Sequence, residues 1–437
     1  MTIDRPDHVP ASGVSRRSLL QGGAAVLGGL VLAGTGAGGG AGGGALSARA
    51  ADTKPYIPSR LTYAPDAPLA GFFRKVAAGT ASIVMAGDSI TEGFGAPSPQ
   101  RGYPARVRAR LRNGSGRPPG GPDHLAARYQ YASEKVPPAT LTYFTHYGPS
   151  GVVDLYAPEL WTERSSQYGP GRRAVKLSAT VVTAMSFRQR STSFEIAWRA
   201  ETAGSAITVQ IGSAAPVRVA AVGVGEQTWP STAGPARTET VTIAFAAGRP
   251  VVEGVQVFDG DEGGGFHVVE AAQSSTVTAQ FSSRSSFRGQ PGNDTWADSL
   301  DRYDPDLVTS MWGTNDYADR IAPATLTQDT RNYLELVHAR CPEAALLVVM
   351  PFRPASATAA SWAPYIAAQQ AAVQQFRGVH PEARVEFFDL GVYVPPLFGR
   401  STVVDNPYMS RDGIHPADAG YDVIGAVLYA FLTSTPA

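Results

Sequence analysis

Ala81-Ser82-Ile83-Val84-Met85-Ala86-Gly87-Asp88-Ser89 is an apolar run that ends abruptly in a polar turn. A short apolar run bounded by turn residues is typical of a buried β-strand. Residues 103–111 then show a helical pattern, and Pro104 suits the first turn of that helix. Strand, loop and helix in this order predict the opening unit of an α/β fold.

The same alternation returns in the C-terminal part of the chain. Apolar runs that predict strands alternate there with longer segments that predict helices. Because such alternation implies right-handed crossovers, we expect a parallel sheet covered by helices on both faces. The predicted strands are 306–311, 344–350 and 384–390, and the predicted helices are 294–303, 325–340, 360–376 and 417–432.

The middle of the chain has a different pattern. From about 174 to 283 it is rich in Thr, Val, Ser and Gly in short alternating runs, such as residues 238–245. Many short strands separated by turn residues predict an inserted β-sandwich of jelly-roll type. We therefore expect an α/β domain formed by residues 51–128 and 284–437, and an inserted β domain at 129–283.

Residues 1–50 have the composition of an export signal. Arg16 and Arg17 precede a run without charge that is rich in Gly and Ala and ends at Ala48-Arg49-Ala50. This pattern resembles a twin-arginine signal peptide, with cleavage expected near Ala50. It predicts a secreted or cell-envelope protein, and the alternative is an uncleaved N-terminal anchor.

Charge and cysteine content exclude several kinds of partner. Lys+Arg and Asp+Glu both number 37, so the formal net charge is zero, and no nucleic-acid partner is expected. No second apolar run could span a bilayer, so no stable membrane insertion is expected. The single cysteine, Cys341, excludes an intramolecular disulfide and is interpreted as a buried thiol. No histidines show zinc-site spacing, and no metal is expected.

Three motifs fall where the chain leaves a strand or enters a helix: Gly87-Asp88-Ser89-Ile90, Gly313-Thr314-Asn315-Asp316 and Asp412-Gly413-Ile414-His415-Pro416. Ligands of open α/β sheets bind beyond the carboxyl ends of the strands, so the three motifs could share one cleft. A serine nucleophile needs a positioned base, and histidine is a suitable base near neutral pH. Asp412, three residues before His415, could hold the imidazole in the required tautomer. The amide of Asn315 could contribute to an oxyanion hole.

These motifs resemble the consensus blocks of the SGNH (GDSL-type) hydrolase superfamily, together with a looser match at Gly289-Gln290-Pro291-Gly292-Asn293-Asp294-Thr295. The resemblance implies a flavodoxin-like three-layer α/β/α fold. It implies Ser89 as nucleophile, His415 as base and Asp412 as the residue that orients it. It also implies an oxyanion hole formed by Ser89, Gly292 and Asn315, and neither a metal nor an organic cofactor.

Two questions stay open at this point. Gly148 and Gly151 compete with Gly292 for the second block, although the helical pattern after Asp294 favours Gly292.

The expected function is a secreted serine esterase that hydrolyses carboxylic esters through an acyl-enzyme, with a carbohydrate O-acetyl esterase as a narrower form. The alternatives are an acyltransferase or lipase on the same fold, or a non-catalytic glycan-binding protein. The expected substrate is an acylated glycan or a lipid-like ester.

Overall fold

A computed structural model describes residues 57–58, 61–114, 123–126, 143–155, 160, 164–165, 167–260, 264–282, 295–394, 407–410 and 412–437. All of them lie in one compact unit, Leu46–Ala437. The predicted signal peptide at 1–50 lies outside the described residues. Within the described residues, no helix is both long enough and apolar enough to cross a membrane.

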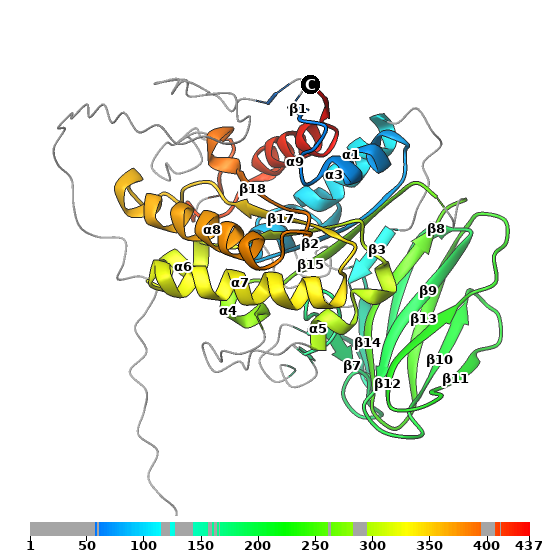
Figure 1. The fold of residues 1–437 in the computed structure, drawn as a ribbon. Coiled ribbons are helices and arrows are strands. Elements are labelled where there is room, and N and C mark those ends of the chain that lie inside the picture. Colours follow the sequence, from blue (N-terminus) through cyan, green and yellow to red (C-terminus); the bar gives the residue numbers. More distant parts are fainter. Residues whose placement is uncertain are drawn as a thin grey trace, which may run out of the picture. The chain divides into compact units, whose positions relative to one another are not determined.

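A parallel sheet forms the centre of the α/β part (Figure 1). Its strands are apolar along almost their whole length, which is expected of strands that are buried on both faces. Adjacent strands are in parallel register; Leu307, for example, pairs with Ile83 on one side and with Ala345 on the other. The strand order is β15 (Phe266–Ala272), β2 (Ala81–Gly87), β16 (Leu307–Met311), β17 (Ala345–Met350) and β18 (Val385–Asp389).

Helices cover both faces of this sheet, which makes three layers (Figure 1). Alternate strand residues serve the two faces: Ile83 and Met85 belong to one core, and Val84 and Ala86 to the other. The first core includes α1 (Ala70–Ala77), α3 (Tyr103–Gly114) and α9 (Asp418–Leu432). The second includes α4 (Thr278–Phe281), α5 (Thr295–Asp298), α7 (Pro323–Arg340) and α8 (Ala359–Val379). The three-layer α/β/α fold is thereby confirmed.

Strands and helices lie close to their predicted residues, with one difference. The helix predicted at 294–303 is, within the described residues, α5 followed by a 3₁₀ turn at Asp301–Tyr303. Leu300 and Trp296 are fully buried there, and Asp304 adopts a left-handed backbone with φ of 40°. This conformation ends the helical path shortly before β16 begins.

Two layers of mainly antiparallel strands pack face to face in the middle of the chain and form a sandwich. One layer is a six-stranded sheet with the order β11 (Val217–Ala220), β10 (Ala206–Ile211), β13 (Arg237–Ala247), β8 (Ala184–Ser191), β4 (Thr145–Gly148) and β5 (Gly151–Val153). The facing layer includes β12 (Gly225–Pro230), β9 (Ser193–Ala200), β14 (Pro250–Phe258), β3 (Asp123–Ala126), β7 (Ala174–Lys176) and β6 (Arg164–Ser165). Their inner side chains, among them Phe187 and Phe194, form one core.

The sandwich and the parallel sheet share strands. The order β12-β9-β14-β3-β15-β2 runs without a break from antiparallel into parallel pairing. Val268 of β15 pairs with Asp123 of β3 at this junction. β15 lies inside the range predicted for the insert, yet its hydrogen bonds make it the parallel neighbour of β2. The division into 51–128, 129–283 and 284–437 itself stays a prediction.

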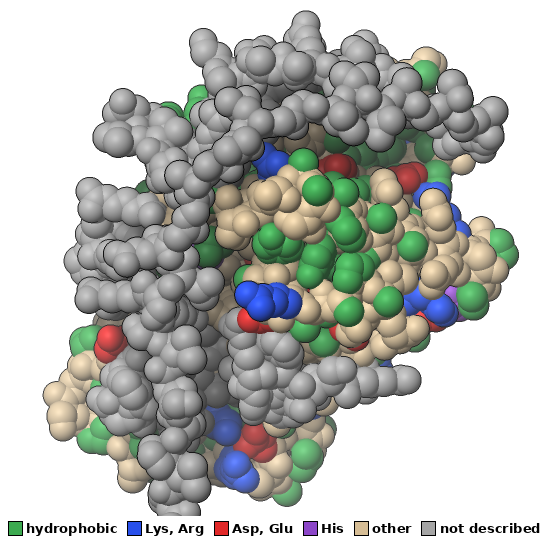
Figure 2. Space-filling model, turned by 90° about the vertical axis from the view of Figure 1, so that its left-hand side faces the viewer, with side chains coloured by type: hydrophobic (Ala, Val, Ile, Leu, Met, Phe, Trp, Pro, Cys, Tyr) green, Lys and Arg blue, Asp and Glu red, His purple; other side chains and the backbone are tan. Residues whose placement is uncertain are grey.

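Charged side chains are dispersed over the described part of the face that Figure 2 shows. On the face shown in Figure 2, the described Lys and Arg side chains stand in small groups, some beside Asp or Glu, and apolar side chains gather between them. The described part of this face carries no continuous basic surface, as the balanced composition leads one to expect. Elsewhere, the short strands β1 (Thr62–Tyr63) and β19 (Thr435–Pro436) pair in parallel and join the two ends of the described chain.

Candidate active site

Ser89 is the first residue of the short helix α2 (Ser89–Glu92), directly beyond the carboxyl end of β2. The Asp88 side chain accepts a hydrogen bond from the Ile90 N–H at 2.9 Å and so caps this helix. A Cβ at Gly87 would lie 2.0 Å from Thr91 Oγ1 and 2.8 Å from the Met311 carbonyl, so only glycine fits there. The Gly-Asp-Ser sequence therefore follows from a tight strand-to-helix turn that leaves Ser89 only 7% exposed.

The structure brings together the three residues of the predicted triad. Ser89 Oγ lies 2.7 Å from His415 Nε2, although the two residues are 326 positions apart. His415 Nδ1 lies 2.6 Å from Asp412 Oδ2. Since a carboxylate only accepts hydrogen bonds, the proton on Nδ1 is donated to Asp412 and Nε2 faces the serine hydroxyl.

The loop that carries His415 is held by its own hydrogen bonds. Asp412 Oδ1 accepts from the N–H groups of Ile414 and His415, each at 2.9 Å. Gly413 has a φ of 68°, a left-handed conformation that glycine adopts without steric cost. The Phe94 ring lies 4.0 Å from the His415 ring, centroid to centroid, and limits its movement. The imidazole is thus oriented both by Asp412 and by an aromatic neighbour.

Electrostatics keep Asp412 ionised. Burial raises the pKa of its carboxyl, but the hydrogen bonds and charge of His415, the backbone N–H groups and the Ser410 hydroxyl outweigh burial. The net effect holds the pKa of Asp412 well below its usual range. Asp412 is therefore an anion at any pH at which His415 could act as a base.

Asn315 occupies the first turn of α6 (Thr314–Ala318), beyond the end of β16. Its Nδ2 donates a hydrogen bond to the Thr276 carbonyl at 2.9 Å. The side-chain amide is therefore directed at the loop that follows β15. The third predicted motif thus lies at the same carboxyl edge as Ser89, one strand along from β2.

That loop, Gln273–Val277, is a part of the site that the sequence motifs missed. The Gln273 N–H donates to the Gly87 carbonyl at 3.1 Å, so the loop begins beside the turn that carries Ser89. Ser275 has a φ of 63°, a left-handed backbone that is uncommon for a residue with a side chain. Four of the five loop residues are buried and Ser275 is half-buried. Residues 268–276, an apolar strand followed by a polar cluster, are the signal that could have revealed it.

The three glycines considered for the second block have different outcomes. Gly292 lies outside the described residues, so its place in the oxyanion hole stays a prediction. Gly151 starts β5 in the six-stranded sheet, with a φ of 121° and no atom within 4 Å of a Cβ built on it. A Cβ built on Gly148 would contact Val153 and the carbonyl of Val181, and both residues belong to the sandwich. No contact of either glycine reaches the triad.

A buried arginine connects this loop to the sandwich side of the molecule. Arg173, 1% exposed, lies 3.4 Å from Glu92 Oε1 and 3.1 Å from Glu270 Oε1. The other oxygen of Glu92 accepts a hydrogen bond from the Ser274 N–H at 2.5 Å. The chain Arg173, Glu92, Ser274 therefore supports the loop that lies between Ser89 and Asn315.

Two buried carboxyls beside the site give the first testable expectation. Burial raises the pKa of Asp88 to about 7 and that of Asp316 to about 7. Because the folded state holds these protons while the unfolded chain releases them near pH 4, the free energy of unfolding should fall as pH rises from about 4 to about 7. Urea unfolding of Asp88→Asn at pH 5 and pH 8 should show a smaller decrease than the wild type. The variant Asp259→Asn, which removes an exposed carboxylate, should keep the wild-type decrease, and an equal decrease in Asp88→Asn would contradict the assignment.

The described residues include one group of three metal-ligating side chains, His338, His380 and Glu382. It lies just before β17 and β18, at the amino edge of the sheet, whereas the triad lies at the carboxyl edge. A cavity of about 230 Å³ lies at the carboxyl edge beyond β17 and β18 and includes Arg353, Trp362 and Asp389 in its lining.

Comparison with known proteins agrees with this geometry. Residues 253–423 match the model of the GDSL-like Lipase/Acylhydrolase family, a range that includes Asn315, Asp412 and His415 and begins after Ser89. No curated protein matches the chain. A solved structure titled "Peptidoglycan O-acetylesterase in action, 5 min" aligns with a TM-score of 0.58 and 17% identity, covering 86% of this chain and 97% of the other.

Two further structures align with a TM-score of 0.30 and 12% identity. One is a family two carbohydrate esterase from Cellvibrio japonicus, covering 72% of this chain and 97% of the other. The second is the salicylyl-acyltransferase SsfX3 from a tetracycline biosynthetic pathway, covering 70% and 95%. The matched family model, the three-layer fold and the contact of Ser89 with His415 lead to one assignment: residues 253–423 belong to a GDSL-like lipase/acylhydrolase domain, and the protein is a serine hydrolase that acts on ester bonds.

Proposed function

We propose that the protein is an exported esterase that removes O-acetyl groups from a carbohydrate, with Ser89, His415 and Asp412 as its catalytic triad. The observation that carries the catalytic part is the unbroken line of contacts from Ser89 Oγ to His415 Nε2 and from His415 Nδ1 to Asp412 Oδ2. Each of these separations is a hydrogen-bond distance, which is what general-base activation of a hydroxyl requires.

In this mechanism Ser89 Oγ attacks the ester carbonyl carbon while His415 Nε2 takes the hydroxyl proton. The tetrahedral intermediate then expels the alcohol, which receives that proton from His415, and an acyl-enzyme remains on Ser89. Water attacks the acyl group with His415 again as base, and the carboxylic acid leaves as Ser89 is regenerated. Asp412 stays ionised throughout and stabilises the imidazolium.

The negative charge on the carbonyl oxygen needs donors that are already in position. We assign this role to the backbone N–H groups of Ser89 and Ser275 and to the side-chain amide of Asn315. Asn315 Nδ2 donates one hydrogen to Thr276, and its second hydrogen is available to an oxyanion. We assign Ser275 because its loop begins with the Gln273 N–H bonded to the Gly87 carbonyl and because Asn315 donates to Thr276, the next residue; the role predicted for Gly292 stays a prediction.

The carbohydrate part of the proposal has two supports. The fold resembles a structure titled as a peptidoglycan O-acetylesterase over 97% of that chain, a span long enough to include the sandwich as well as the α/β part. The cavity whose lining includes Arg353 and Asp389 lies at the carboxyl edge of the sheet, beyond β17 and β18, and offers charged groups that could bind the hydroxyl groups of a sugar. Export follows from the predicted twin-arginine signal, and acetylated envelope glycans would be within reach of an exported enzyme.

The catalytic part is tested by labelling the protein with a serine-reactive fluorophosphonate, followed by intact-mass measurement and peptide mapping. One adduct on the Ser89 peptide, absent from Ser89→Ala, is expected. Labelling of another serine, or none in a folded protein, would overturn the assignment of the nucleophile.

The substrate is tested by comparing release of acetate from O-acetylated glycans with hydrolysis of p-nitrophenyl acetate and octanoate. Preferential release from the glycan supports the proposal. Preference for octanoate would indicate a lipase, and transfer of the acetyl group to added sugar in place of water would indicate an acyltransferase. Both outcomes would leave the triad intact while overturning the substrate class.

Ser275 can be tested by its backbone conformation. Ser275→Gly should keep kcat within a few-fold, because glycine adopts the left-handed φ and retains the N–H. Ser275→Val should lower kcat by about a hundredfold, because a β-branched residue disfavours that φ and displaces the oxyanion donor. Steady-state kinetics on p-nitrophenyl acetate would measure both. Equal kcat values in the two variants would remove the Ser275 N–H from the oxyanion hole.

Asn315→Ala should lower kcat by about a hundredfold to a thousandfold with little change in KM, which is typical of a lost oxyanion donor. Steady-state kinetics on p-nitrophenyl acetate would measure this effect. The matched control is Asn332→Ala on α7, a half-buried residue whose side chain accepts a hydrogen bond from Gln328. A near-normal kcat in Asn315→Ala would show that the amide serves the loop alone.

A further inference from the structure

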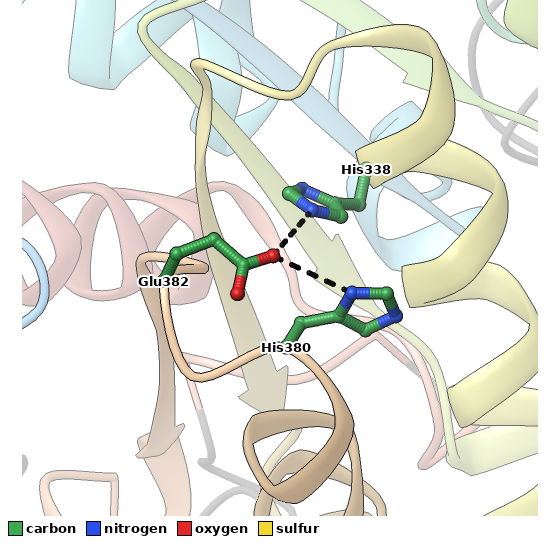
Figure 3. Close-up of side chains that lie close together, drawn as sticks. All are labelled: His338, His380 and Glu382. Carbon is green, nitrogen blue, oxygen red and sulfur yellow. Dashed lines mark ion pairs between the residues drawn. The ribbon is translucent and has the colours of Figure 1, made fainter.

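His338, His380 and Glu382 come together away from the triad (Figure 3). His338 lies in the last turn of α7, and His380 caps the carboxyl end of α8. Glu382 follows two residues later in the loop that leads into β18. The side chains of all three residues point into the space between these two helix ends.

The distances within this cluster are too long for hydrogen bonds. Glu382 Oε1 lies 3.6 Å from His338 Nε2 and 3.6 Å from His380 Nδ1. A nitrogen–oxygen hydrogen bond measures about 2.7 to 3.2 Å. Ligand atoms that share a tetrahedral Zn²⁺ at about 2.0 to 2.2 Å stand roughly 3.3 to 3.6 Å apart. The separations therefore match a shared ion better than direct pairing.

The second nitrogen of His380 strengthens this argument. His380 Nε2 lies 2.7 Å from Glu335 Oε2 on α7. Since the carboxylate can only accept, Nε2–H donates to Glu335, which leaves Nδ1 as the ring nitrogen that a metal ion could take. Nδ1 and Glu382 Oε1 are too far apart for a hydrogen bond, and a cation between them would bind both. A carboxylate on the outer nitrogen of a histidine is also the usual way to orient a metal ligand.

We propose that His338 Nε2, His380 Nδ1 and Glu382 Oε1 bind one Zn²⁺ ion, with water as its fourth ligand and Glu335 orienting His380. Two imidazoles with one carboxylate suit Zn²⁺, whereas Ca²⁺ and Mg²⁺ prefer oxygen ligands alone. The His338 ring is packed edge-on against Phe376, with centroids 5.7 Å apart, which limits its rotation. All three ligand atoms lie within 4.8 Å of one another, and the two imidazoles would turn toward each other when an ion binds.

The proposed role is structural, because the cluster and the triad occupy opposite edges of the sheet. An ion bound by α7 and by the loop after α8 would connect the carboxyl ends of the two helices, just before the strands that follow them. It would raise the thermal stability of the fold without taking part in ester hydrolysis.

The test is isothermal titration of the untagged, chelator-treated full chain with ZnCl₂, in the wild type and in three variants. The wild type should bind one Zn²⁺ with micromolar or tighter affinity and should melt at a higher temperature with zinc. The double variant His338→Gln/His380→Gln should bind at least a hundredfold more weakly. Glu335→Gln should lose about tenfold to a hundredfold, as expected for a residue that orients a ligand. Glu343→Gln, which removes an 89% exposed carboxylate paired with Arg384 on the same edge, should bind zinc like the wild type.

Two results would overturn the proposal. The first is a wild-type protein that binds no zinc at tens of micromolar. The second is a double variant that binds zinc as tightly as the wild type. That result would place the ion at other residues, for example His415 and Asp412. Anomalous scattering at the zinc edge from crystals grown with equimolar zinc should show a peak between His338 and His380.

Discussion

Ser89→Ala is expected to lower kcat by about a millionfold, because the nucleophile that forms the acyl-enzyme is removed while the oxyanion donors remain. The fold should be unaffected, since alanine suits the first position of α2 and the Asp88 cap does not involve the Ser89 side chain. His415→Ala should cause a comparable loss. The double variant should be little worse than either single variant, because the two residues act as one unit.

Steady-state hydrolysis of p-nitrophenyl acetate and far-UV circular dichroism would test this expectation together. Ser98→Ala is a matched control, because Ser98 lies in the same segment and makes no side-chain cap hydrogen bond to the turn that follows it. Its kcat should stay near that of the wild type. If Ser89→Ala kept more than about one hundredth of the activity, a different group would have to be the nucleophile.

Arg173→Met is expected to lower the free energy of unfolding by about 3 to 5 kcal/mol, the usual cost of removing one partner from a buried ion pair. Arg173 and Glu92 are both 1% exposed, and Glu270 is almost as buried, so neither carboxylate can turn to water. Methionine fills similar volume but leaves both acids without their cation. Burial already raises the pKa of Glu270 to about 7, and the loss of Arg173 would raise it further.

Urea unfolding followed by tryptophan fluorescence would measure the loss. Arg190→Met is the matched control, because the Arg190 side chain is 63% exposed in its pair with Asp259 and should change stability by less than about 0.5 kcal/mol. Activity should also fall in Arg173→Met, since Glu92 holds the Ser274 N–H of the loop beside Ser89. A variant as stable as the wild type would show that Glu92 and Glu270 find other partners.

The sequence by itself determined the fold class and the candidate triad. The strand that contains Ile83 to Ala86 is buried on both faces of the sheet. A continuous apolar run in the sequence predicts such a strand. The motifs at Ser89, Asn315 and His415 are short and local, and each sits at the end of a strand or the start of a helix. Because the carboxyl ends of parallel strands lie at one edge of the sheet, the sequence alone could assign the three motifs to a common site.

Only the tertiary structure decided how the loop Gln273–Val277 takes part. The residue pattern of β15 predicts one more strand of a β-rich insert. No feature of its own sequence distinguishes it from the neighbouring antiparallel strands. Its parallel pairing with β2 is a contact between distant segments, which composition does not encode. That pairing places Gln273 beside the turn that carries Ser89, and Ser275 follows in the same loop with a left-handed backbone. Arg173 is buried against Glu92 beneath this loop. Local motifs therefore identified the candidate triad, whereas the loop beside it and the buried support of that loop depend on strand pairing between distant segments.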